Sequence, residues 1–349
     1  MKKKLLPLLP IAIAPMLVGC NNDNRIRITY GSPTISSAVD ITYDQLAAKM
    51  TNGENMIVVT YHQEYSPSCE CWKAFKPIID KYADDNDVYI YQIDRLLFNG
   101  HDDFGFTLLN QSNPSLIITK DGEKKHEYLY GKNNASMFTD ASGFKKAIEK
   151  VVKAPQFMVV NSDYLDNKLL KSNDTFVIYY SWSFCPDCNY CMPKVLQPYS
   201  QTNNFRTKFY MIDLAVPGIL MTDDNKWPSE GTSVATYVDY LKNHHMSKAG
   251  DEKFGYDRGF VPTFQYYKGG ELTDMCVYFN DALTNEGGKW KVSRSYYSQD
   301  RIANLGYTNT VLEGMEVSES EVVDGGWKQE AMAKHHDPIL KSFLNKYVK

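Results

Sequence analysis

Residues 183–195 read SFCPDCNYCMPKV, and the interpretation of the whole chain depends on this stretch. Cys185, Cys188 and Cys191 follow one another at intervals of three residues. Thiols at this spacing can form a redox couple with one further cysteine, supply three ligands of a metal, or belong to a set of structural disulfides. The compartment of the protein and the sequence around the stretch distinguish these alternatives.

The N-terminus has the pattern of an export signal. Three lysines are followed by an uncharged run over residues 5–18, which three prolines interrupt and which is too short to predict a membrane span. The run ends in LVGC, which resembles the lipobox of bacterial lipoproteins, where the peptide is cut before a cysteine that then carries acyl chains such as palmitate. We therefore expect a signal peptide over residues 1–19, lipidation of Cys20, and an extracytoplasmic body anchored to the cell membrane by lipid. An ordinary secretion signal with a chance cysteine is the alternative.

The composition is that of a globular protein, with 43% hydrophobic and 23% charged residues. Removal of the signal peptide takes away three lysines and no acidic residue, so that the formal net charge changes from −4 to −7. An acidic body without a basic cluster argues against binding of nucleic acid. The length favours two domains, and the polar stretch over residues 20–39 is interpreted as a lipidated N-terminus and tether.

Six cysteines remain once Cys20 is lipidated, in a compartment that permits disulfides. Five of them lie in two short stretches, which makes a set of scattered structural disulfides a weaker interpretation. The six are Cys69, Cys71, Cys185, Cys188, Cys191 and Cys276.

One order of predicted elements occurs twice along the chain. In the first half, a helix capped by Thr42, with Gln45 completing a capping box, is followed by a strand over residues 56–61. Cys69 and Cys71 then open a longer helix.

The second half repeats this order. A strand over residues 157–160 is followed by a helix that Ser162 caps, and then by a strand over residues 175–180. Cys185 and Cys188 open the next helix. An internal repeat of this kind predicts two similar units.

Prolines mark the same positions in both halves. Pro77 and Pro193 each fall eight residues after the first cysteine of their half, and Pro114 and Pro262 each lead a later strand. With these residues in place, both halves resemble thioredoxin domains. That family has a hydrophobic strand, an aromatic residue and Cys-x-x-Cys at a helix start, a proline within the helix, and an x-Pro-Thr strand whose proline is cis.

The resemblance implies an α/β fold of two tandem thioredoxin-like domains, each with a central mixed sheet flanked by helices. The boundaries that we expect are 40–154 for the domain with Cys-x-Cys and 155–349 for the domain with Cys-x-x-Cys, the second with insertions. The second half departs from the family at Tyr179, which stands where a buried acid is often found. A long insertion is expected before a final helix over residues 338–347.

The chemistry of the second half follows from the place of its cysteines. Cys185, at the first turn of a helix, faces unpaired N–H groups and the positive end of the dipole, which favour its thiolate. It is the expected attacking thiol, with its sulfur near the surface, and Cys188 is the expected resolving thiol. The carboxylate of Asp187 opposes the thiolate. The resemblance implies that Val261 and Pro262 form a cis peptide bond that faces the substrate.

The first half is altered at the corresponding places. Cys69 and Cys71 are two residues apart, and Trp72 stands where the second cysteine would be. The pair is either a second redox centre or a structural link in a degenerate domain, or it binds a metal weakly. By the same resemblance Pro114 belongs to a cis-proline region, although its partner motif is altered.

The remaining candidates are weaker. Cys191 either pairs with Cys276 or stays a buried thiol. The three cysteines of residues 183–195 with a fourth ligand could bind zinc or an iron–sulfur cluster, but a proline after the first cysteine favours redox chemistry, and we expect no metal or other cofactor. His244-His245 and His335-His336 are interpreted as surface residues, because neighbours on a helix point in different directions.

Two classes of function remain. The first is a membrane-anchored thiol–disulfide oxidoreductase that acts on thiols and disulfides of exported or cell-surface proteins, with a redox partner in the membrane. The second is a non-catalytic lipoprotein that uses thioredoxin folds to hold a peptide or an envelope partner. Reduction or oxidation of a model disulfide, and its dependence on Cys185, distinguishes the two classes.

Overall fold

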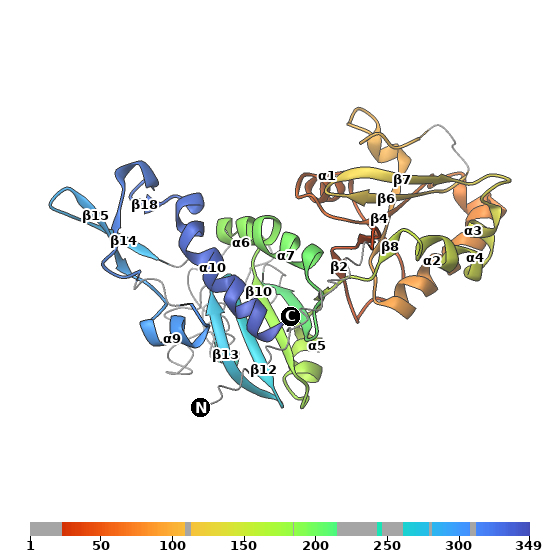
Figure 1. Cartoon of the computed structure of the whole chain (residues 1–349). Coiled ribbons are helices and arrows are strands. Elements are labelled where there is room, and N and C mark those ends of the chain that lie inside the picture. The colour runs from red at the N-terminus through yellow and green to blue at the C-terminus, as the bar shows by residue number, and fades with distance from the viewer. Residues whose placement is uncertain are drawn as a thin grey trace, which may run out of the picture.

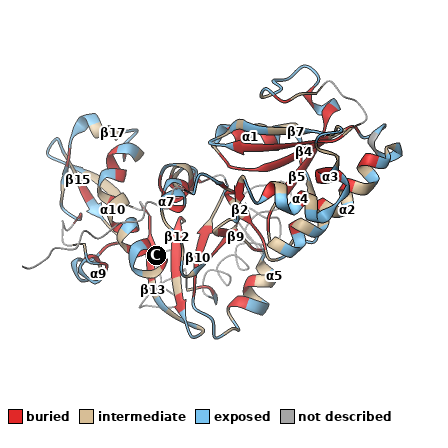
Figure 2. Cartoon of the chain, turned by 45° about the vertical axis from the view of Figure 1, so that its right-hand side comes forward, coloured by how far each residue is buried: buried red, intermediate tan, exposed pale blue. Residues whose placement is uncertain are grey.

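The computed structural model describes residues 23–108, 113–183, 185–214, 243–245, 261–278, 281–307 and 312–349, without the side chain of Ser66. Their helices and strands form two lobes, each built around its own sheet (Figure 1). The central strands of both sheets consist of buried residues (Figure 2). None of the helices in these residues is both long and apolar enough to cross a membrane.

The sheet of the first half has five strands, three of them parallel and the last two antiparallel to their neighbours. Its strands, in order across the sheet, are β3 (Val39–Asp40), β5 (Ile90–Asp94), β4 (Ile57–Tyr61), β6 (Ser115–Lys120) and β7 (Glu123–Leu129). The helices of this half are α1 (Tyr43–Thr51), α2 (Glu70–Asn86), α3 (Ala135–Thr139) and α4 (Ala141–Ile148), with 3-10 turns at Ser66–Ser68 and Arg95–Phe98.

Alternate residues of β4 face opposite layers. Ile57 and Val59 belong to the core that also contains Phe75 of α2, whereas Val58 belongs to the core that contains Leu46 of α1. Successive side chains of a strand point to opposite faces, so helices cover both faces of this sheet and bury its centre.

The sheet of the second half repeats the order and strand directions of the first, with one strand added at an edge. Across this sheet lie β13 (Glu271–Val277), β12 (Thr263–Lys268), β10 (Phe176–Ser181), β11 (Lys208–Asp213), β9 (Phe157–Val159) and the added β2 (Tyr30–Gly31). Its helical segments are α5 (Ser162–Tyr164), a π-helical turn (Leu165–Leu169), α6 (Pro186–Cys191), a second π-helical turn (Met192–Leu196), α7 (Gln197–Thr202), α9 (Gln299–Asn304) and α10 (Gln329–Tyr347).

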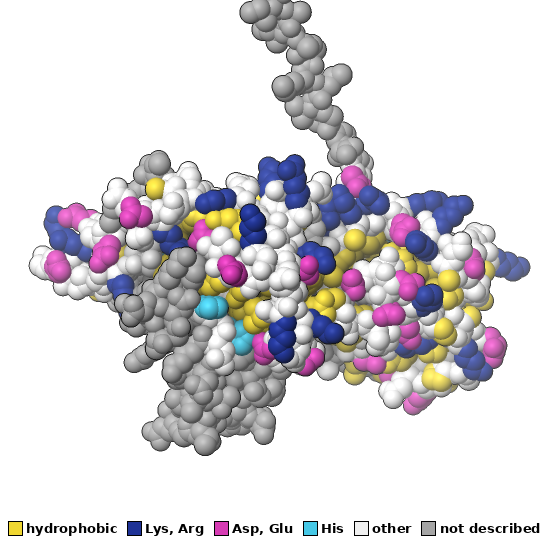
Figure 3. All heavy atoms as spheres, turned by 90° about the horizontal axis from the view of Figure 1, so that it is seen from below, with side chains coloured by type: hydrophobic (Ala, Val, Ile, Leu, Met, Phe, Trp, Pro, Cys, Tyr) yellow, Lys and Arg dark blue, Asp and Glu magenta, His cyan; other side chains and the backbone are white. Residues whose placement is uncertain are grey.

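The insertion of the second half forms two small sheets outside the main one (Figure 1). One contains β14 (Ala282–Glu286), β15 (Lys289–Arg294) and β16 (Glu316–Val317), and the other contains β17 (Val322–Val323) and β18 (Gly326–Trp327), with a 3-10 turn at Glu319–Glu321. The buried Val292 and Trp327 join these sheets to the core under α10. On the face in Figure 3, positive and negative side chains of the described residues are interspersed.

Local predictions are confirmed in the first half and need two corrections in the second. Thr42 caps α1, and its capping box with Gln45 is present. Asn161, not Ser162, caps α5, because the Asn161 side chain accepts a hydrogen bond from the Tyr164 N–H at 2.8 Å. The final helix begins at Gln329, and Pro338 lies inside it rather than at its start.

The predicted tether is wrong for the residues from Asp23 onward, because this segment is part of the folded body. Ile26 and Ile28 are buried, and β1 (Ile26–Arg27) pairs in parallel with β8 (Val152–Lys153). The next residues form β2, which pairs with β9 of the second half. The segment therefore packs into the core of the first half and adds a strand to the sheet of the second.

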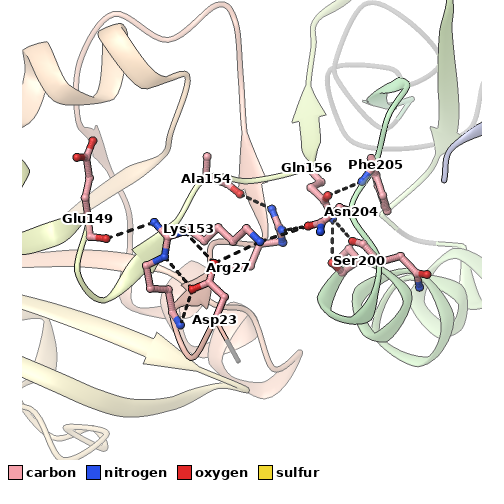
Figure 4. Close-up of polar contacts among 11 residues, drawn as sticks. Asp23, Arg27, Glu149, Lys153, Ala154, Gln156, Ser200, Asn204 and Phe205 are labelled. Carbon is pink, nitrogen blue, oxygen red and sulfur yellow. Dashed lines mark hydrogen bonds and ion pairs between the residues drawn. The ribbon is translucent and has the colours of Figure 1, made fainter. Parts of the chain in front are cut away.

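Polar contacts reinforce this junction (Figure 4). The Arg27 guanidinium donates to the Ala154 carbonyl at 3.0 Å and to Asn204 Oδ1 at 2.8 Å. Gln156, at the start of the second half, donates to the Ser200 carbonyl at 2.8 Å and accepts from the Phe205 N–H at 2.7 Å.

Candidate functional site

Cys185 lies at the N-cap of α6, as the sequence predicts. Its sulfur accepts a hydrogen bond from the backbone N–H of Cys188, with an N···S distance of 3.4 Å, and its own N–H donates to the Trp182 carbonyl at 2.9 Å. Pro186, with no N–H to lose, occupies the first turn of the helix. Cys185 is thus held at the point where unpaired N–H groups of the helix gather.

The loop before the helix is fixed by the end of the neighbouring strand β11. The Ser183 hydroxyl and N–H donate to the two carboxylate oxygens of Asp213 at 2.6 and 3.1 Å. Because the parallel strands β10 and β11 end side by side, this carboxylate reaches the turn that leads to Cys185.

The loop before β12 brings a proline against the first cysteine. The Val261–Pro262 peptide bond is cis, as the resemblance implies. The Cys185 thiol lies 3.5 Å from the backbone oxygen of Val261. Cys185 is only 7% exposed, so the expected position of its sulfur near the surface is wrong, because the sulfur packs against this loop.

The pKa values of the Cys185 and Cys188 thiols are shifted in opposite directions. The pKa of Cys185 is lowered, first by a hydrogen bond from the Cys188 side chain and then by the backbone N–H groups of the helix start, against the effect of burial. The pKa of Cys188 is raised well above its usual value, first by burial and then by the nearby Cys185. Cys185 is therefore the thiol that ionises first.

Asp187, between the two cysteines, acts as the sequence predicts. Its negative charge raises the pKa of Cys185 and so opposes the thiolate. Burial raises the pKa of Asp187 itself, while the Gln329 side chain of α10 donates to its carboxylate at 2.9 Å. The C-terminal helix thus contacts the first turn of α6, between Cys185 and Cys188.

The two further cysteines are buried thiols and not a disulfide. The Cys276 sulfur lies 2.9 Å from the Tyr297 hydroxyl, and Cys191, the last residue of α6, is buried in the core. Of the two alternatives for this pair, the structure contains the buried thiols. Within the described residues no three His, Cys, Asp or Glu side chains are grouped closely enough to hold a metal ion.

In the first half, Cys69 caps α2 and forms a disulfide with Cys71. The side-chain oxygen of Asn113 lies 3.4 Å from the sulfur of Cys71 and 3.8 Å from that of Cys69. Trp72, at the place of the missing cysteine, stacks on Tyr61 with 5.0 Å between ring centroids.

Pro114 requires a correction. It leads β6 as Pro262 leads β12, but its peptide bond is trans, since among the described residues only the Val261–Pro262 bond is cis. The resemblance was weaker here because the cysteine motif beside Pro114 is altered. Cys20 and the rest of residues 1–22 lie outside the described part of the chain.

The histidine pairs are not simply surface residues. His244 is 4% exposed and pairs with Asp166 at 2.6 Å, while His336 is fully buried and pairs with Asp281 at 2.5 Å. Sequence reasoning missed both carboxylate partners, because each lies at least 55 residues away along the chain.

A cavity of about 120 Å³ opens beside the second cysteine. The buried side chains of Cys188, Tyr179 and Gln197 contribute to its lining. Tyr30 and Asn52, from the first part of the chain, line it as well. The sequence contains no signal for this cavity, which forms where the N-terminal segment meets the second sheet.

No protein-family model matches the chain, and no curated protein matches it. Among solved structures, an N21Q mutant thioredoxin from Halobacterium salinarum is 17% identical, with a TM-score of 0.25, over 35% of this chain and 95% of that chain. Oxidised thioredoxin O1 from Arabidopsis thaliana is 17% identical, with a TM-score of 0.25, over 34% and 99%. The zinc-bound form of human ERp44 is 13% identical, with a TM-score of 0.23, over 69% and 56%.

Features of the chain itself match the resemblance found in the sequence. The cysteine at the start of α6, the cis proline beside it and the hairpin of β12 and β13 are those that the sequence resemblance implies. In sequence pattern, strand order and the cis proline, the chain resembles the thioredoxin-like superfamily.

Proposed function

We propose that the protein is a thiol–disulfide oxidoreductase whose reactive pair is Cys185 and Cys188. The observation that carries this proposal is the asymmetry of the two thiols on one helix turn. Cys185 has a lowered pKa and Cys188 a raised one. Attack on a disulfide needs a thiolate, and its resolution needs a second thiol within reach.

The reaction follows from this assignment. The Cys185 thiolate attacks one sulfur of a substrate disulfide, and the other substrate sulfur leaves as a thiolate and takes a proton. Cys188 then loses its proton and attacks the sulfur of Cys185, which releases the second substrate thiol. The substrate gains two electrons and two protons, and the protein pair becomes a disulfide. The same steps in reverse oxidise a substrate dithiol.

The fold of the enzyme is, in this proposal, a tandem of two thioredoxin-like domains over residues 40–154 and 155–349. The equal strand order of the two main sheets supports it. So does the equal place of Cys69 and Cys185, each of which caps its helix. The Cys69–Cys71 disulfide is then a second redox pair in the first domain.

The cellular setting is also a proposal. The lipobox-like LVGC supports cleavage before Cys20 and anchoring of the body to the outer face of the cell membrane by lipid. The substrates are then thiols and disulfides of exported or cell-surface proteins. We also propose a redox partner in the membrane that restores the reactive pair, because each net oxidation or reduction of a substrate changes the oxidation state of the pair.

The test of the function is a trapping experiment with the full chain in cells. Cys188→Ser should accumulate mixed disulfides with exported proteins, because the intermediate on Cys185 cannot be resolved. Cys185→Ser should trap none, and Cys276→Ser, a matched change at a buried thiol outside the pair, should also trap none. Equal trapping by the two variants of the pair would overturn the roles, and no trapping by either would favour the non-catalytic binding protein.

A further inference from the structure

The resolving step requires a path for one proton. Cys188 is 4% exposed, and its pKa is raised well above the usual value by burial and by Cys185. A buried thiol can become a nucleophile only if its proton reaches an acceptor. Tyr179 stands where the resemblance would place a buried acid, so a carboxylate is not the acceptor at that position.

The cavity beside Cys188 reaches from the protein surface to this thiol. Its inner part is formed by buried side chains, among them Tyr179 and Gln197, whereas Asn52 and Ser183 at its edge are exposed. A volume of about 120 Å³ admits several water molecules, since one water needs only about 10–15 Å³ of such space. None of the described residues that line it is Asp, Glu or His.

Two buried polar side chains, Tyr179 and Gln197, line the inner part of the cavity. The Tyr179 hydroxyl and the Gln197 Nε2 are buried, and neither makes a hydrogen bond of ordinary geometry with a described protein residue. The Cys188 thiol is the polar neighbour of the Tyr179 hydroxyl, and the Tyr30 hydroxyl is the polar neighbour of the Gln197 side chain. Buried polar atoms of native proteins are satisfied by protein or by ordered water. Two such atoms in one cavity with the Cys188 thiol therefore indicate a bound water cluster rather than an apolar packing defect.

One wall of the cavity comes from the segment before the first sheet. Tyr30 of β2 lies on the second sheet through the pairing of β2 with β9. Burial raises the pKa of its hydroxyl well above the usual value, and the adjacent Gln197 side chain partly offsets this effect. Asn52, at the end of α1, completes the same wall.

We propose that this cavity holds ordered water that carries the proton of Cys188 to solvent, and that Tyr30, Tyr179 and Gln197 position this water. The proposal rests on the proposed function. In the resolving step, the S–H bond of Cys188 breaks and its proton passes to the water. The thiolate forms the Cys185–Cys188 bond while the bond from Cys185 to the substrate breaks, and the departing substrate thiolate takes a proton from solvent.

The proposal assigns a role to the N-terminal segment in the chemistry of the second half. Without β2, the cavity lacks the side of its lining that Tyr30 forms, and the Gln197 side chain lacks the adjacent Tyr30 hydroxyl. The segment that the sequence presents as a tether is then a positioning element for the resolving step, and the reactive pair depends on residues more than 150 positions away.

Rapid mixing of the reduced full chain, in detergent, with a fluorescence-quenched peptide disulfide separates the two steps. Cys185 attack is measured in a Cys188→Ser background, and resolution is measured from release of the second peptide thiol by the chain that retains Cys188. Tyr30→Phe and Gln197→Leu should each slow resolution at pH 7 at least fivefold and move its pH profile to higher pH. Attack by Cys185 should stay within twofold of the rate of the Cys188→Ser chain that carries no further change.

Two variants serve as controls. Gln201→Leu makes the same change on the same helix, α7, at an exposed residue outside the cavity, and should resolve within twofold of wild type. Tyr128→Phe, on β7 of the first sheet, should change neither step. Unchanged resolution in Tyr30→Phe and Gln197→Leu, equal slowing of both steps, or a Gln201→Leu variant as slow as Gln197→Leu would overturn the proposal. If Cys185 of the wild-type pair attacks no disulfide, the proposed function itself fails, which the first step reveals separately.

Discussion

The sulfur of Cys185 lies 3.5 Å from the backbone oxygen of Val261, the residue before the cis proline. In the first half the corresponding contact is made by a side chain, since Asn113 Oδ1 lies 3.4 Å from the sulfur of Cys71. Both halves thus place the residue before a strand-leading proline against their sulfurs. The contact is made by a backbone oxygen in the second half and by a side-chain oxygen in the first.

Asp187 should control the thiolate of Cys185. Its negative charge raises the pKa of Cys185, so Asp187→Asn should lower that pKa and increase alkylation of Cys185 at pH 7 by about threefold. The rate should rise with pH in both proteins, because only the thiolate reacts, and its midpoint should lie at lower pH in the variant. Alkylation followed by mass spectrometry measures both values. A midpoint that moves upward would contradict the assigned role of this carboxylate.

The buried pair of His336 and Asp281 should be essential for stability. Both side chains are fully buried, so His336→Leu leaves the Asp281 carboxylate without this partner in the core. Loss of one member of a buried pair costs about 3–5 kcal/mol, to be measured by denaturant unfolding. His335→Leu, the change at the adjacent half-buried position, should cost less than about 1 kcal/mol. Equal effects of the two changes would show that the pair contributes little.

Residues whose role is set by local chemistry were predicted from the sequence. The capping box of Thr42, the cysteines at two helix starts and the cis bond before Pro262 depend on short patterns or on the family resemblance. The repeat of strands and prolines likewise predicted the equal strand order of the two halves.

Features that depend on distant residues were not predictable. β2 has two residues and therefore no periodicity, so nothing in the sequence marked it as a strand of the second sheet. The burial of His244 and His336 follows from carboxylates brought to them by the fold. The cavity beside Cys188 is lined by Tyr30 and Asn52 together with residues between 179 and 211, which only the folded chain brings together.

Arg27 should stabilise the junction of the N-terminal segment with the second half. Arg27→Ala removes donations to the Ala154 carbonyl and to Asn204 Oδ1, which should lower the free energy of unfolding by about 1–2 kcal/mol. Arg25→Ala is the matched control, because Arg25 is exposed and pairs with the nearby Asp23, so its loss should change stability little. Denaturant unfolding of both variants decides the question, and an equal loss from the two would show that the junction contacts are not specific.

The Cys69–Cys71 disulfide should matter for redox steps that need two centres. If it is a second redox pair, Cys69→Ser should lower isomerase or relay activity at least fivefold, because the pair can no longer accept or return electrons. Simple disulfide reduction by Cys185 should stay within twofold of wild type, since the two pairs occupy different lobes of the molecule (Figure 1).

The same variant also tests the structural interpretation of the first half. A structural link gives a different pattern, in which every redox assay matches wild type while unfolding occurs at lower denaturant concentration, because the closed ring restrains the unfolded chain. Activity assays and unfolding curves on one preparation of Cys69→Ser therefore separate the two roles. Wild-type redox activity with lowered stability would identify the first half as a scaffold, with catalysis confined to Cys185 and Cys188.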